Sequence, residues 1–195
     1  MTRLPLRPDL SLWLLAPDAD LEQACVDLAA LTAPPFWAFC WGAGQALAHY
    51  LALHPAVVRG RRVVDLGAGS GVVAIAAARA GASHVTAVDI DVSALEATRH
   101  NARLNGVRIH VANSIPEDWD VLLAADVGYE TSPRRQLGAL ASRGTVLVAD
   151  PVRHPSHALE GTPVLRVLAG TVPEVDPPPR PITVWALRGS ELAGT

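Results

Sequence analysis

The feature that most constrains this chain is the glycine-rich segment Asp65-Leu-Gly-Ala-Gly-Ser-Gly71. It follows the apolar pair Val63-Val64 and leads into an apolar, alanine-rich stretch at 72–80. This order predicts a strand, a tight turn and a helix. Glycines permit a positive φ and a close approach of the backbone to a ligand, because no Cβ obstructs it. The helix would begin with free N–H groups and the positive end of its dipole, which suit a carboxylate or a phosphate.

A second carboxylate helps to identify the ligand of this turn. Asp89 ends the apolar run that begins at His84, and a carboxylate there can accept hydrogen bonds from both hydroxyls of a ribose. The charge of Asp65 would repel a pyrophosphate but attract the ammonium group of a methionine moiety. We therefore expect S-adenosylmethionine as the cofactor, bound by Asp65, Asp89 and the glycines Gly67, Gly69 and Gly71. NAD and a turn without a ligand are the alternatives, because residues 69–74 also fit the pattern G-x-G-x-x-A.

Length and composition predict one domain over residues 1–195. Of the 195 residues 50% are hydrophobic, yet no apolar run reaches the roughly 18 residues that a membrane span requires. Acidic residues interrupt the N-terminal apolar stretch after Arg3 and Arg7, which argues against a signal or transit peptide and favours a cytoplasmic protein. The net charge is −3 and no basic block occurs, so we expect neither a nucleic acid nor a membrane as a partner.

The chain contains no lysine, since all 16 basic residues are arginine. This excludes a Walker A phosphate loop, a Schiff-base lysine and a Tyr-x-x-x-Lys dehydrogenase site. Cys25 and Cys40 are too few for a disulfide framework and lack metal-ligand spacing. His154 and His157 have no carboxylate or cysteine pattern around them, so no metal is predicted. A Gly-x-Ser-x-Gly hydrolase motif is also missing.

Apolar runs alternate with helical patterns, which indicates an α/β fold with a largely parallel sheet. An Asp91 N-cap and an Asn105-Gly106 stop predict a helix over Asp91–Asn105, and proline-rich residues 173–181 predict a loop before a final antiparallel strand. We predict an N-terminal helical cap at 1–57, a Rossmann-like seven-stranded core at 58–188 with helices on both faces, and a tail at 189–195. The other predicted helices are Asp20–Leu31, Gly44–Leu53 and Pro133–Ser142, and the predicted strands are Arg62–Leu66, His84–Asp89, Arg108–Val111, Asp120–Ala124, Thr145–Ala149, Val164–Leu168 and Thr183–Leu187.

Ligands of open α/β sheets bind beyond the carboxyl ends of the strands. Besides Asp65 and Asp89, the predicted strands bring Asn113, Asp126 and Asp150 to this edge. Asn113 could hydrogen-bond the adenine edge of the cofactor, or it could simply form the turn after its strand. Ala125 is small enough to lie against the adenine ring.

Several segments together resemble the seven-strand protein lysine methyltransferases, most closely the enzymes that methylate the β-subunit of electron transfer flavoprotein. The resemblance covers roughly residues 34 to 188. It depends on Pro35-Phe-Trp-Ala with Trp41, Gly44-Gln-Ala-Leu, Val58-Arg-Gly60, Asp65–Gly71 with Ala74-Ile-Ala-Ala, Asp89-Ile-Asp91 and Asp126-Val-Gly-Tyr129.

The resemblance implies roles for three more residues. Asp126 and Tyr129 would be catalytic, with Asp126 attracting and orienting the amine or receiving its proton, and Tyr129 orienting Asp126 or forming a wall of the lysine channel. Trp41 would contact the cofactor, whereas Trp37 lies in an apolar segment that favours core packing. The substrate that the resemblance implies is a protein lysine, on the β-subunit of electron transfer flavoprotein. A small nitrogen compound such as a pyridine amide, or a relative that binds the cofactor without turnover, remains the alternative.

Overall fold

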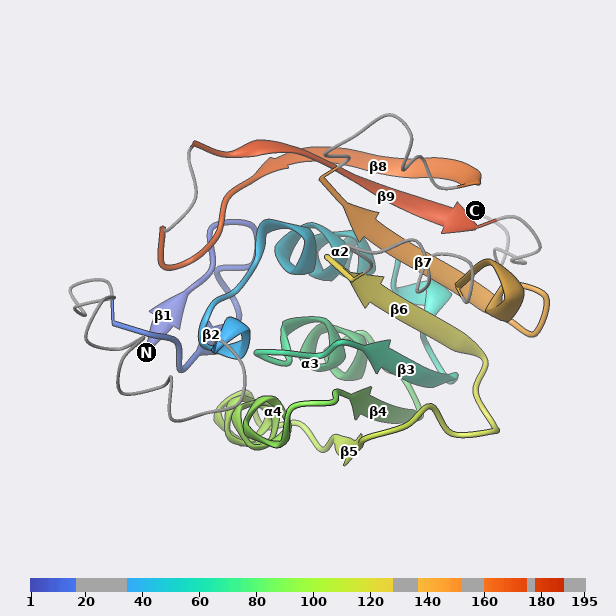
Figure 1. Cartoon of the computed structure of the whole chain (residues 1–195), viewed down its shortest axis with the longest axis horizontal. Helices are drawn as coiled ribbons and strands as arrows, with labels where there is room; N and C mark the ends of the chain where they lie inside the picture. Colours follow the sequence, from blue (N-terminus) through green and yellow to red (C-terminus); the bar gives the residue numbers. More distant parts are fainter. Residues whose placement is uncertain (17–34, 128–136, 152–159, 175–177, 188–195) are drawn as a thin grey trace.

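The computed structural model describes residues 1–16, 35–127, 137–151, 160–174 and 178–187. Its centre is a seven-stranded sheet in the order β5-β4-β3-β6-β7-β9-β8 (Figure 1). β9 runs antiparallel to both of its neighbours, and the other pairs are parallel. The predicted α/β class with an antiparallel last strand is therefore confirmed. The strands are β3 (Arg62–Leu66), β4 (His84–Val88), β5 (His110–Ala112), β6 (Val121–Ala125), β7 (Thr145–Asp150), β8 (Gly161–Ala169) and β9 (Arg180–Leu187).

The last two strands are longer than the sequence predicted, because proline is tolerated in them. β8 is an edge strand with a register shift between Pro163 and Leu165, and edges and bulges are where a sheet accepts proline. β9 is paired on both sides, but its pairing with β7 begins only at Thr183. Pro181 therefore lies in the part of β9 that needs no hydrogen bond toward β7.

Three helices lie along one face of the sheet: α2 (Gly42–Leu53), α3 (Val72–Arg79) and α4 (Val92–Leu104) (Figure 1). α4 begins at Asp91, whose side chain accepts a hydrogen bond from Ser93 N at 2.8 Å, and Asn105 is its C-cap, as predicted. The opposite face packs against the helical residues 137–140, which belong to the predicted helix 133–142. Among the described residues, no helix is long and apolar enough to cross a membrane. The predicted helix Asp20–Leu31 and tail 189–195 lie outside them.

The first residues form a small hairpin that the sequence did not predict. β1 (Thr2–Arg3) pairs with β2 (Ser11–Leu12), and two short 3-10 helices, η1 (Phe36–Ala38) and η2 (Pro55–Val57), flank α2. The hairpin is fixed to α4 by amide side chains: Asn105 exchanges hydrogen bonds with the backbone of Ser11, and Asn101 Oδ1 accepts one from Trp13 N at 2.7 Å. Strands of two residues have no periodicity to read, which explains why they were missed.

Candidate active site

The glycine turn between β3 and α3 has the backbone that its sequence predicts. Gly67, Gly69 and Gly71 all have positive φ, at 70°, 51° and 81°, a region that side chains other than glycine enter at a cost. A Cβ on Gly67 would lie 2.5 Å from Val127 Cγ1, whereas one on Gly69 would meet nothing closer than Trp37 Cα at 3.9 Å. The turn is therefore tightly packed against Val127 at Gly67 and against Thr98 at Gly71, and of the three glycines only Gly69 has room beside it.

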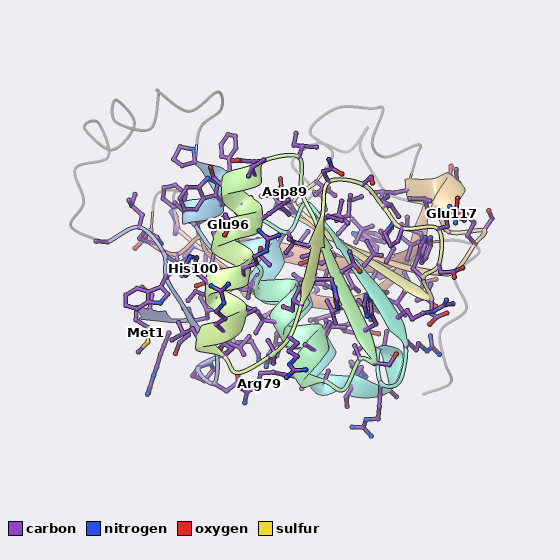
Figure 2. All side chains as sticks on the ribbon, turned by 90° about the horizontal axis from the view of Figure 1, so that it is seen from below. Met1, Arg79, Asp89, Glu96, His100 and Glu117 are labelled. Carbon is purple, nitrogen blue, oxygen red and sulfur yellow. The ribbon has the colours of Figure 1, made fainter. Side chains whose placement is uncertain are left out.

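Asp89 follows β4 and connects it to this turn. Its Oδ2 accepts a hydrogen bond from Gly69 N at 2.9 Å, and its Oδ1 accepts one from Asp91 N at 3.0 Å. The side chain is half-buried, and each carboxylate oxygen can accept more than one hydrogen bond. Figure 2 shows Asp89 near the first turn of α4, at the opposite edge from Arg79 at the end of α3. The two oxygens of Asp89 can therefore accept further hydrogen bonds from a ribose. The ribose contact itself stays a prediction.

Asp65 lies beneath the turn and is only 1% exposed. Its Oδ2 accepts a hydrogen bond from Ala74 N at 2.9 Å, so it satisfies one of the free N–H groups in the first turn of α3. The pKa of the Asp65 carboxyl is raised to about 7, mainly because the group is buried; the Ala74 hydrogen bond lowers this pKa and the charge of Asp89 raises it, both to a smaller extent. The sequence did not reveal this capping role. The predicted contact with a cofactor ammonium group is untested.

Two polar residues of α4 hold the carbonyl groups of the turn, and sequence reasoning missed them. Thr98 Oγ1 donates to Gly69 O at 3.1 Å, and Asn101 Nδ2 donates to Ser70 O at 2.9 Å. Both side chains are fully buried. The helical spacing of the sequence could have revealed them. Thr98 and Asn101 follow Ala94 at intervals of four and seven residues, so they lie on the same buried face of the helix.

Ile90 is a second residue that sequence reasoning did not select. Its side chain is 94% exposed directly after the ribose candidate Asp89. A large aliphatic side chain in this place is suited to pack on an apolar ring such as adenine. Asn113 lies in an exposed bend after β5, and Ala125 is the last, half-buried residue of β6. Their predicted contacts with adenine stay predictions.

Asp126 and Trp41 come together at the end of β6 although they are far apart in the sequence. Asp126 has a left-handed backbone with a φ of 55°, and its N–H donates to Ala149 O at 3.0 Å. Trp41 precedes α2 and donates from Nε1 to Phe36 O at 2.9 Å. Tyr129 lies outside the described residues. Asp126 and Trp41 line one cavity, whose other walls are Gly42, Ala43, Pro151, Ala169, Gly170, Thr171, Arg180 and Ile182.

These residues fit a bound S-adenosylmethionine. The turn is open at Gly69, Asp89 offers a carboxylate, and Ile90 offers an exposed apolar surface next to it. The contact that a Cβ on Gly67 would make with Val127 places the turn beside the segment that carries Asp126. A ligand spanning from Asp89 along the turn would therefore point its far end toward the cavity of Asp126 and Trp41.

Comparison with known proteins gives matches to methyltransferases. The sequence model of the ribosomal protein L11 methyltransferase (PrmA) family matches residues 40–127. The electron transfer flavoprotein beta subunit lysine methyltransferase of Xenopus laevis is 39% identical over 178 residues, which cover 84% of this chain and 70% of the relative. The protein of the same name from Mus musculus is 37% identical over 160 residues, covering 76% of this chain and 62% of the relative.

A solved structure supports the fold assignment. The ribosomal protein L11 methylase of Lactobacillus delbrueckii subsp. bulgaricus superposes with a TM-score of 0.52 at 25% identity, covering 75% of this chain and 79% of that protein. The fold and the sequence matches define an S-adenosylmethionine-dependent methyltransferase. Within that class, the chain belongs to the family of the electron transfer flavoprotein beta subunit lysine methyltransferases.

Proposed function

We propose that this enzyme methylates a lysine side chain of a protein, and that the substrate is the electron transfer flavoprotein beta subunit. The names of the relatives support this substrate. The observation that carries the proposal is the small cavity at the end of β6, which Asp126 and Trp41 both line. A carboxylate and an aromatic ring are groups that attract an alkylammonium ion.

The residues of the cavity perform the binding and orientation that methyl transfer requires. When bound, the cofactor supplies a methyl group on a sulfonium, already activated for attack by an amine nitrogen. Asp126 attracts and orients the lysine amine, or receives the proton that the amine loses. Phe36 and Phe39 pack around Trp41, with ring centroids 6.1 and 5.8 Å away. Phe36 is 59% exposed, so this aromatic cluster would exclude water from the reacting groups only once a protein substrate covers it.

Incubation with labelled S-adenosylmethionine tests the substrate. Purified enzyme would be mixed either with recombinant electron transfer flavoprotein beta subunit or with a cell extract, and labelled peptides would be identified by mass. Because the enzyme has no lysine, labelled lysine can come only from another protein. We expect label on a lysine of the beta subunit. Label only in the small-molecule fraction would favour methylation of a small nitrogen compound, and no transfer at all would favour an inactive relative.

The location of the enzyme is also a proposal. We propose the cytoplasm, where the buried free thiol of Cys40 would stay reduced. Cell fractionation followed by an immunoblot tests this, and recovery of the enzyme in an organelle or envelope fraction would contradict it.

A further inference from the structure

The cavity that Asp126 lines has a second ionisable residue in its wall, which has no part in the proposed methyl transfer. Arg180 is the first residue of β9 and lines the cavity together with Asp126 and Trp41. It is half-buried, and its backbone pairs with Ala169 at the end of β8. A basic residue is thus part of the wall of the space that the incoming amine would enter.

The other elements around this cavity add a further positive group. The first residues of α2, Gly42 and Ala43, also line it. No side chain caps this end of the helix, so the positive end of the helix dipole faces the cavity. Among the described residues, the acidic groups near it are Asp126, the buried Asp150 at the end of β7, and the exposed Glu174 in the loop before β9.

These charges bear on a problem that lysine methylation must solve. A free lysine amine titrates near ~10.4, but only its neutral form has the lone pair that attacks a methyl group. Asp126 alone would favour the charged ammonium form. A cation in the same cavity has the opposite effect, because bringing a second positive charge close to it is unfavourable.

We propose that Arg180 favours the neutral form of the bound lysine amine and so lowers the pH at which the enzyme can methylate. This inference depends on the proposed function, because it needs a substrate amine in the cavity. Arg180 acts through its charge, in concert with the α2 N-terminus, while Asp126 orients the amine. The combination binds a lysine without trapping it as ammonium.

Measurement of the methylation rate against pH tests the proposal. The substrate is recombinant electron transfer flavoprotein beta subunit, and label is counted in the substrate after separation from the enzyme. In Arg180→Gln the rising limb of the profile should move to higher pH by about one unit, which is about a tenfold lower rate at pH 7.5. Near pH 10 the variant and the wild type should converge.

Two other variants complete the design. Arg180→Lys keeps the charge and should keep the wild-type profile. Arg166→Gln removes one positive charge from the same hairpin, on β8 but outside this cavity, and should also leave the profile unchanged. Thermal unfolding and the affinity for S-adenosylhomocysteine establish that each variant is folded.

The outcomes separate this inference from the proposed function. An unshifted profile in folded Arg180→Gln, or loss of activity at every pH, would overturn the role of the charge while leaving lysine methylation intact. If Arg180→Gln does not fold, the test uses Arg180→Lys, and a shifted pH profile in that variant would overturn the role of the charge. A wild-type enzyme that methylates no lysine would reject the proposed function itself.

Discussion

The two halves of the active site are built in different ways. The cofactor half lies within one continuous segment, where Asp65 binds Ala74 N, Asp89 binds Gly69 N and Thr98 binds Gly69 O. The proposed substrate half brings Asp126 and Arg180 into one cavity from distant parts of the chain, together with Trp41, whose predicted contact with the cofactor stays a prediction. The first half is specified by the contiguous segment from β3 to α4, whereas the second exists only once the whole sheet has formed. Substrate choice can therefore change without disturbing cofactor binding.

The largest effect expected from this division is on turnover. Asp126→Asn should lower the methylation rate by a factor of about 100 or more, the range expected for loss of a group that acts on a proton or orients the reactant. The affinity for S-adenosylhomocysteine should stay within a few-fold. Asparagine tolerates the left-handed backbone of residue 126, so the fold should persist. Single-turnover rates and calorimetry measure the two quantities.

Asp118→Asn is the control for this substitution, because Asp118 lies before β6 at the other end of the strand and its side chain is 87% exposed. It should change neither quantity. An Asp126→Asn enzyme with the wild-type rate would show that Asp126 only shapes the turn, and a large loss of cofactor affinity would contradict the separation of the two halves.

A substitution in the cofactor half should weaken the binding of S-adenosylhomocysteine, the quantity that Asp126→Asn leaves nearly unchanged. Asp89→Ala removes the acceptor for Gly69 N and the proposed acceptor for the ribose, and each hydrogen bond to a charged group contributes about 1.5–3 kcal/mol. We expect at least tenfold weaker binding of S-adenosylhomocysteine, measured by calorimetry. Unchanged affinity would reject the ribose assignment, and a preference for NAD would reject the cofactor.

Asp91→Ala is the matched control. Asp91 also accepts a backbone hydrogen bond, as the N-cap of α4, so its loss should cost about 1 kcal/mol of unfolding free energy. The affinity should remain within a few-fold of wild type. Equal losses of affinity in both variants would mean that Asp89 acts only by holding the local backbone.

The same division explains what the sequence could predict. The glycine turn, the N-cap of α4 and the succession of strands along the chain depend on residues close together in the sequence, and the structure confirms them. The predicted strand ends placed Asp126 at the sheet edge, a family resemblance supplied the roles of Asp126 and Trp41, and the sequence missed Arg180. The pairing of β9 between β7 and β8 brings Arg180 to the cavity, and that register cannot be derived from local patterns. Thr98 and Asn101 lie on α4, whose bounds the sequence predicted almost correctly. Their role was missed because a buried polar side chain can be interpreted only when its hydrogen-bond partner is known.

A smaller effect is expected from the apolar part of the cofactor half. Ile90→Ser should weaken binding of S-adenosylhomocysteine by about five- to thirtyfold, since burying an aliphatic side chain against a ligand contributes roughly 1–2 kcal/mol. Ile90 is exposed, so the melting temperature should hardly change. Leu53→Ser is the control, because Leu53 is 54% exposed at the end of α2, away from the glycine turn. Equal affinities of Ile90→Ser and wild type would remove Ile90 from the cofactor site.

The smallest expected effect is the pH dependence of cofactor binding that Asp65 would cause. It tests whether Asp65, beneath the glycine turn, contacts the cofactor. Burial raises the pKa of Asp65 from 3.8 to about 7, so below pH 7 the carboxyl of the free enzyme is mostly protonated. If a cofactor ammonium group pairs with it, binding favours the charged form and lowers this pKa, so a proton leaves on binding. The affinity for S-adenosylhomocysteine at pH 7 should then be about twofold weaker than at pH 8, with about half a proton released. Calorimetry at pH 7 in buffers of different ionisation enthalpy measures that proton, and Asp65→Asn should abolish its release. Binding without proton release in the wild type would leave Asp65 as the cap of α3 alone.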